Sequence, residues 1–155
     1  MVIQTTLSLG EIRSTVASVV DPEIPVLTID DLGILRSVEV EDGRVRITIT
    51  PTYSGCPAMS QIEDDIVDAL ESAGVEEAEV VVTHSPAWTT DWMSEEGRRK
   101  LAEFGIAPPT GESEVVCPQC QADSPRMVAR FGSTACKALM VCGDCGEPFD
   151  HFKAI

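Results

Sequence analysis

The sequence predicts a small α/β protein, a two-layer sandwich with the element order α-β-β-α-β-α, followed by a four-cysteine module. Segments of helical periodicity alternate with short segments of alternating polarity, which is typical of helices packed on a sheet. Two Cys-x-x-Cys pairs lie in the last forty or so residues of the sequence. The 155 residues, 43% of them hydrophobic, suit one domain of about 100 residues and a small additional module.

The first predicted helix begins where Ser8 and Glu11 have the spacing of a capping box. It should run to Asp21, because the residue before a proline is disfavoured in a helix. Its apolar face consists of Ile12, Val16, Val19 and Val20. A loop to Gly33 leads into a hairpin of two strands with period-two polarity, joined by a turn at Asp42-Gly43. The apolar positions of the hairpin are Val38 and Val40 on the first strand and Val45, Ile47 and Ile49 on the second.

The second half of the sandwich begins with a helix whose first turn contains Pro57 and whose end is marked by Gly74. A valine-rich strand follows over 78–83, and then a loop in which Trp88 and Trp92 should anchor on the core. Ser94 caps the last helix, where the basic cluster 98–100 is interpreted as a solvated face.

The cysteine pairs predict a zinc ribbon. Cys117/Cys120 and Cys142/Cys145 are separated by 21 residues, and a tetrahedral thiolate site needs two such knuckles on one ion. Iron in the same site, two disulfides, or four buried thiols are the alternatives. The predicted domains are a sandwich over 1–106, a linker over 107–114 and a ribbon over 115–155, which lacks enough core to fold without its metal.

The composition of the chain disfavours nucleic-acid binding and membrane association. Lys and Arg number 11 and Asp and Glu 26, which gives a net charge of −15. Such a surface repels phosphate backbones, so a nucleic-acid role is disfavoured. No apolar stretch could span a bilayer, and no signal peptide is evident, so we expect no membrane association. Metal-type cysteine spacing without an export signal indicates a reducing cytoplasm. A homodimer is left open.

Cys56 is the cysteine outside the ribbon region. It follows a strand and Gly55 and precedes a predicted helix, where the helix dipole should lower the pKa of the thiol. A thiolate is both a nucleophile and a soft metal ligand, whereas the alternative is a small buried residue. Asp21 and Glu23 could simply cap and turn the chain. Cys136 is interpreted as a buried residue beside the metal site, and the alternative is a second functional thiol activated by Lys137.

Several motifs together carry a family resemblance. Residues 8–104 resemble the small iron–sulfur assembly domain of SufT and of targeting factors in cytosolic iron–sulfur protein assembly. The motifs are Asp21-Pro22-Glu23-Ile24-Pro25, Asp31-Leu32-Gly33-Ile34, Thr50-Pro51-Thr52, Cys56-Pro57 and Ser85-Pro86-Ala87-Trp88. The ribbon adds the segments 131–137 and 147–150 around its knuckles. With these, nearly the whole chain is similar to the PaaD family (also called PaaJ), whose members belong to the phenylacetyl-CoA epoxidase system.

The resemblance implies a maturation role in aerobic phenylacetate degradation rather than catalysis by this chain. In that system the oxygenase subunits hold a di-iron centre, and a reductase carries flavin and a ferredoxin-type cluster. The PaaD component resembles a factor that helps to place iron or an iron–sulfur cluster in these partners. The resemblance makes Cys56 the candidate ligand for a transient iron or cluster, with Asp21 and Glu23 as hard ligands or hydrogen-bond acceptors.

Two other classes of function compete with this expectation. In the first, the chain is a structural or interaction subunit of the oxygenase complex with no metal-transfer role. In the second, it is a thiol enzyme with Cys56 as the nucleophile, for which His84 is the nearest candidate base in the sequence.

Overall fold

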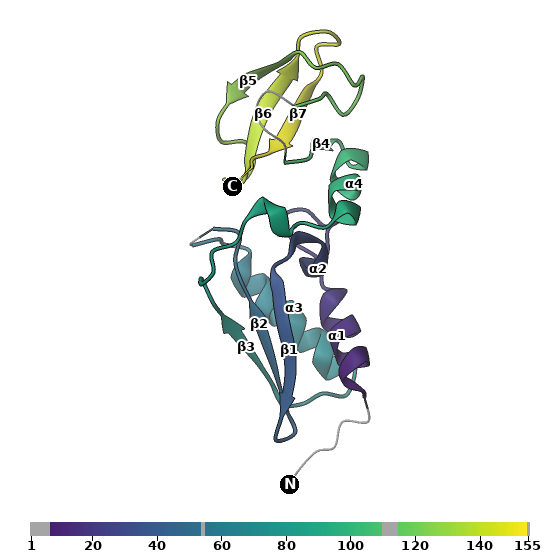
Figure 1. Cartoon of the computed structure of the whole chain (residues 1–155), viewed down its shortest axis with the longest axis vertical. Helices are drawn as coiled ribbons and strands as arrows, with labels where there is room; N and C mark the ends of the chain where they lie inside the picture. Colours follow the sequence, from purple (N-terminus) through teal and green to yellow (C-terminus); the bar gives the residue numbers. More distant parts are fainter. Residues whose placement is uncertain (1–6, 54, 110–114, 155) are drawn as a thin grey trace. The chain divides into compact units, whose positions relative to one another are not determined.

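The computed structural model describes residues 7–53, 55–109 and 115–154 and divides into two compact units, Met1–Trp88 and Thr89–Ile155. Each unit contains one small sheet (Figure 1). The mixed α/β class and the clustering of four cysteines near the C-terminal end are confirmed. The last predicted helix of the sandwich falls in the second unit. None of the helices within the described ranges is long and apolar enough to cross a membrane.

The first unit is a two-layer arrangement of helices on a three-stranded sheet. Its main elements are α1 (Leu9–Ala17), β1 (Leu35–Glu41), β2 (Arg44–Ile49), α3 (Met59–Ser72) and β3 (Ala78–Val82). β2 is central, antiparallel to β1 and parallel to β3, and α3 makes the crossover between β2 and β3. α1 and α3 contact each other and pack on the sheet (Figure 1). The fully buried side chains between the layers include Ile12, Val16, Val45, Ile47, Ile49, Ile62, Ile66 and Leu70.

Local signals in the first unit mostly form as expected, but the first helix is shorter than predicted. The Ser8–Glu11 capping box is present, and both residues of the Asp42-Gly43 turn have positive φ, as a tight hairpin turn requires. However, α1 ends at Ala17, not at Asp21. The chain turns there because the Val19 carbonyl accepts a hydrogen bond from Ile29 N at 2.8 Å. Val40, expected on the apolar face, is 44% exposed because it lies at the end of β1.

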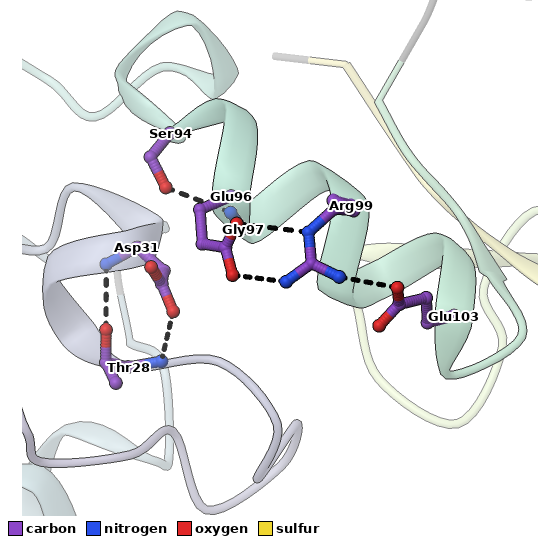
Figure 2. A network of polar contacts seen from close by, with 7 residues as sticks. All are labelled: Thr28, Asp31, Ser94, Glu96, Gly97, Arg99 and Glu103. Atoms are coloured by element: carbon purple, nitrogen blue, oxygen red, sulfur yellow. Dashed lines mark hydrogen bonds and ion pairs between the residues drawn. The ribbon is translucent and has the colours of Figure 1, made fainter.

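A one-turn helix, α2 (Ile29–Leu32), lies in the segment that the sequence predicted as loop. Thr28 and Asp31 form a complete capping box around it, with hydrogen bonds of 3.0 and 3.1 Å (Figure 2). The Leu32 carbonyl at its end accepts a 2.8 Å hydrogen bond from Nε1 of Trp88, which is buried. The prediction that Trp88 anchors its loop on the core is therefore confirmed, and this contact holds α2 in place.

α3 begins later than predicted. It begins at Met59, so Pro57 lies in the preceding turn instead of in the first helical turn. The Cys56 carbonyl accepts a hydrogen bond from Met59 N at 3.3 Å, and Cys56 N donates to the Tyr53 carbonyl at 3.3 Å. Cys56 is thus fixed in a turn at the approach to the helix rather than at its first residue.

The second unit consists of a helix followed in the sequence by a four-stranded sheet. Its elements are η1 (Thr90–Trp92), α4 (Glu95–Glu103), β4 (Ile106–Ala107), β5 (Pro125–Ala129), β6 (Lys137–Cys142) and β7 (Pro148–Phe152). The strand order is β4-β7-β6-β5. Its small core contains Ala107, Val115, Cys117, Ala138, Met140, Cys142 and Phe149. Ala107, the first residue of the predicted linker 107–114, is thus part of strand β4 and of this core. Residues 110–114 of that linker lie outside the described residues.

The basic cluster on α4 is only partly a solvated face. Ser94 caps the helix through the amide of Gly97, as expected, and Arg99 pairs with Glu96 and Glu103 on the exposed side (Figure 2). Arg98 behaves differently, because its guanidinium donates to the carbonyl oxygens of Thr90 at 2.9 Å and Pro109 at 3.0 Å. Arg98 ties together the two segments that flank α4.

Candidate metal centre and the Cys56 loop

The two cysteine knuckles close into one cluster in the second unit. The cysteine sulfurs of the group lie within 4.8 Å of one another: Cys117, Cys120, Cys142 and Cys145. Each knuckle is a turn held by backbone hydrogen bonds: Gln121 N donates to the Cys117 carbonyl at 2.9 Å, and Gly146 N to the Cys142 carbonyl at 3.0 Å. The first cysteine of each knuckle is buried and the second is exposed. The chain therefore presents a preformed group of four sulfurs at the edge of a small core.

The spacing of the sulfurs fits a tetrahedral ion. Cys117 Sγ lies 3.8 Å from Cys145 Sγ, and Cys120 Sγ lies 3.5 Å from Cys142 Sγ. Sulfurs about 2.3 Å from a zinc ion lie about 3.8 Å apart at the corners of a tetrahedron. A disulfide needs sulfurs at about 2.05 Å. The geometry therefore fits a metal site and not a pair of disulfides.

The electrostatics of the cluster also favour a cation. Hydrogen bonds from the backbone N–H groups of Cys145 and Asp144 lower the pKa of the Cys142 thiol to about 7. The backbone N–H of Glu147 lowers the pKa of Cys145, but partial desolvation of the sulfur and hydrogen bonds with the neighbouring thiols outweigh it and raise that pKa to about 12. Four adjacent sulfurs cannot all ionise unless a positive charge compensates them, and a bound metal supplies that charge.

Gly143 lies inside the second knuckle, where a side chain would collide with the chain opposite. Its amide donates to the Ser124 carbonyl at 2.8 Å, and a Cβ would lie 2.8 Å from that same oxygen. We expect Gly143→Ala to destabilise the metal-loaded ribbon by about 1–3 kcal/mol, as overpacking does. Thermal denaturation of the loaded protein measures this change. The control is Gly10→Ala on α1, where the nearest atom is 3.8 Å away and little or no loss is expected. Equal melting temperatures of the Gly143→Ala and Gly10→Ala variants would contradict the prediction.

The second candidate site is the loop around Cys56 in the first unit. The thiol is half-buried, and the carboxylates of Glu23 and Asp21 lie close enough to act on it electrostatically. The prediction of a lowered pKa is wrong. Burial raises the pKa of Cys56, Glu23 and Asp21 raise it further, and the backbone N–H of Ala58 only partly opposes them. Asp21 and Glu23 therefore act on the Cys56 thiol through their charge, but among the described residues the three side chains do not form a close group of ligand atoms like that of the ribbon cysteines.

Asp21 also has a structural role. Its Oδ1 accepts hydrogen bonds from Glu23 N at 2.7 Å and Ile24 N at 3.2 Å, and the residue is only 8% exposed. This is the cap-and-turn role that the sequence left as an alternative. The turn fixes the backbone of Glu23, whose charge acts on Cys56, so Asp21 has a supporting role in this loop.

Tyr53 is a residue of the site that the sequence interpretation missed. Its side chain makes a hydrogen bond that lowers the pKa of Cys56. Tyr53 is the single tyrosine of the chain and precedes Cys56 by three residues. That position in a predicted loop before the cysteine was the signal that could have identified it.

The charge of Glu23 gives a test of this arrangement. Neutralising it in Glu23→Gln should lower the pKa of Cys56, because a negative neighbour disfavours the thiolate. At a fixed pH below that pKa, more thiolate is then present, and Cys56 should be alkylated faster. The rate is measured by mass spectrometry after iodoacetamide treatment. Glu76→Gln, an equal charge change elsewhere in the same unit, should leave the rate unchanged. An equal rate in wild type and Glu23→Gln would mean that the two groups do not interact.

Two further candidate residues, Cys136 and His84, are outside the four-sulfur group and the charge interactions of Cys56. Cys136 is buried, with its Sγ 3.0 Å from Oγ1 of Thr134, and the neighbouring Lys137 is buried and pairs with Asp150 at 3.9 Å. The burial agrees with the interpretation of Cys136 as a packed residue. His84 is exposed in the loop after β3, and the described residues include no hydrogen bond between it and Cys56.

Comparisons with known proteins match both parts of the chain. Residues 10–82 match the iron–sulfur cluster assembly protein family, and residues 105–153 match the PaaD zinc β-ribbon domain. An Escherichia coli (strain K12) protein, provisionally named as the D component of 1,2-phenylacetyl-CoA epoxidase, is 48% identical in an alignment 153 residues long that covers 94% of this chain and 92% of that protein. An Fe-S protein maturation auxiliary factor of Porphyromonas gingivalis is 42% identical over 54% of this chain and 81% of its own length.

A solved structure supports the fold of part of the chain. The domain of unknown function DUF59 from Bacillus anthracis aligns with a TM-score of 0.56 and 30% identity. The alignment covers 60% of this chain and 90% of that one. The likeness therefore spans nearly the whole of the smaller protein.

Proposed function

Because the chain belongs to the PaaD family of 1,2-phenylacetyl-CoA epoxidase components, we propose that it is an accessory maturation subunit of that multicomponent enzyme. It assists the assembly of iron or an iron–sulfur cluster in the oxygenase or reductase subunits. The observation that carries this proposal is a half-buried thiol, Cys56, on which the charges of Glu23 and Asp21 act, within a segment that matches the iron–sulfur cluster assembly protein family. Its relatives include a protein named as an Fe-S maturation factor, which supports the same role.

The chemistry of the Cys56 loop suits a transient cargo. The thiolate is a soft ligand and the carboxylates are hard ligands, a mixture that accepts iron. A thiol whose pKa is raised is protonated near neutral pH, so iron binding must displace a proton. That competition weakens binding and favours release to a client. Cys56 is proposed as the ligand, with Asp21 and Glu23 as hard ligands or hydrogen-bond acceptors.

The ribbon has a different role in this proposal. Cys117, Cys120, Cys142 and Cys145 hold a structural zinc ion, and four thiolates fill its coordination sphere. The sulfur separations and the match to the PaaD zinc ribbon support this assignment. The proposed domains are the assembly domain 1–106, the linker 107–114 and the ribbon 115–155, with Ile106 and Ala107 at the boundary contributing β4 to the ribbon sheet.

Metal analysis of protein purified without oxygen tests both assignments. Wild type should hold zinc in the ribbon and, after incubation with ferrous iron, show iron binding with an absorption band from sulfur–iron charge transfer. Cys56→Ala should lose the iron and its absorption but keep the zinc. Equal iron binding by both proteins would contradict the role of Cys56, whereas loss of zinc in Cys56→Ala would contradict the separation of the two sites.

An interaction subunit without metal transfer is the second candidate. The structural hydrogen bonds of Asp21 favour it, because they account for that carboxylate without a ligand. The two candidates differ in stoichiometry: an interaction subunit must co-purify in a fixed ratio with active oxygenase, whereas a maturation factor can act at lower abundance. Quantitative mass spectrometry of the active complex distinguishes them.

A further inference from the structure

In the part of the chain that the structure describes, the edge strand β5 has one side open for pairing with a further strand. β5 is the outer strand of the four-stranded sheet, paired with β6 on one side, and no strand of the described ranges pairs with its other side (Figure 1). Its backbone groups on that side are available to a further strand, the arrangement that proteins use for strand addition. A register shift between Met127 and Ala129 leaves Val128 out of the pairing with β6.

Exposed apolar side chains concentrate at this edge. Met127 is 44% exposed, Val128 49% and Phe131 65%, which is the highest value among the exposed large hydrophobic residues described. All three fall within five residues of the sequence. Exposed apolar groups that gather in this way, rather than singly, mark interaction surfaces.

Phe131 is held in its exposed position. The ammonium of Lys153 lies 4.2 Å from the centre of the ring and also donates to the Arg130 carbonyl at 3.1 Å. The next residue, Gly132, donates to the Lys137 carbonyl at 2.7 Å, and a Cβ there would approach that oxygen to 3.3 Å. A side chain fixed before binding loses little conformational entropy on binding, which makes Phe131 a suitable anchor.

The same edge is basic in an otherwise acidic chain. Residues 124–143 contain two arginines and one lysine and no acidic residue, although the net charge of the chain is −15. Lys137 is buried and paired with Asp150, so Arg126 and Arg130 carry the exposed charge. We define the β5 surface as Arg126, Met127, Val128, Arg130 and Phe131. Its charge is complementary to an acidic partner.

We propose that the β5 surface docks an extended acidic segment of an epoxidase component, which adds as a further strand beside β5 and places an apolar side chain against Phe131. The identity of the partner rests on the proposed function. A second copy of this chain fits poorly, because antiparallel pairing of two β5 strands centred on Val128 places Arg126 opposite Arg130, and like charges across strands repel.

Binding of the full-length, metal-loaded protein to the purified oxygenase and reductase components tests this proposal. Phe131→Ser and Arg130→Glu should each weaken binding to one component, with a dissociation constant at least ten times that of wild type. Wild-type affinity should fall as salt is added, because salt screens the charges. Hydrogen exchange of the wild-type complex should show protection of β5 amides. That last measurement keeps the test informative if a variant folds poorly.

The controls are matched in chemistry and exposure. Phe104→Ser replaces a phenylalanine that is 55% exposed outside the β5 surface, and Arg13→Glu reverses a charge on α1; both should bind as wild type. Wild-type-like binding of Phe131→Ser and Arg130→Glu would overturn the proposal, as would protection elsewhere without protection of β5. Failure of the wild type to bind either component would overturn it too.

Iron in the oxygenase and the reductase provides the separate readout for the proposed function. If the surface variants lose binding while Cys56→Ala still yields both components iron-loaded, the docking surface stands and the maturation role fails. If Cys56→Ala yields an iron-poor oxygenase or reductase while the surface variants bind normally, the maturation role stands and the β5 surface is wrong.

Discussion

Replacing Cys142 by serine is expected to abolish tight metal binding by the four-cysteine cluster and to unfold the β4–β7 sheet. Cys142 is 1% exposed, belongs to the small ribbon core and ends β6, so its loss removes a ligand from the centre of the module. Structural zinc contributes on the order of 10 kcal/mol to the folding of such modules. The core of the second unit is too small to compensate for a loss of this size.

Metal content and hydrogen exchange measure the two parts of this expectation. Cys142→Ser should hold little zinc, and the amides of β5, β6 and β7 should lose their protection while those of the first unit keep it. A chelator added to wild type should have the same effect. The matched control is Cys136→Ser, also in a buried position, 6% exposed, but outside the cluster. A zinc-free ribbon that stays folded would contradict the prediction.

The elements that the sequence predicted correctly have local causes. The Ser8–Glu11 box, the Asp42-Gly43 turn and the Ser94 cap each depend on residues within three positions of one another. The cysteine knuckles are equally local, since each turn is closed by hydrogen bonds within five residues. Such features form wherever their residues occur in a compatible context.

The errors arose where contacts between distant residues decide the outcome. α1 stops early because Val19 bonds Ile29, and α2 was missed because one turn shows no periodicity although its Thr28 cap is present. The pKa of Cys56 follows burial, a property of the packed fold, rather than the helix start. The electrostatic effect of Glu23 on Cys56, across 32 intervening residues, could be expected from the family resemblance and not from spacing.

The second large effect is expected in the client enzyme. Cells that carry Cys56→Ala should make an oxygenase or reductase that lacks most of its iron, and growth on phenylacetate should fail although every subunit is present. The physical reason is that the thiolate is the soft ligand of the proposed cargo site, and alanine leaves only the carboxylates of Asp21 and Glu23. The fold should survive, because Cys56 is half-buried in a loop and a point change of this kind costs about 1–2 kcal/mol.

Iron analysis of the purified oxygenase and reductase, together with growth on phenylacetate, measures this effect. Cys136→Ala is the control, because it removes a free thiol of the same chain that lies in the second unit and outside the cluster. It should leave client iron and growth at wild-type levels. Addition of ferrous iron to the purified clients from Cys56→Ala cells should restore activity if iron alone is missing. Fully iron-loaded, active clients in Cys56→Ala cells would rule out maturation through this thiol and would favour the interaction-subunit alternative.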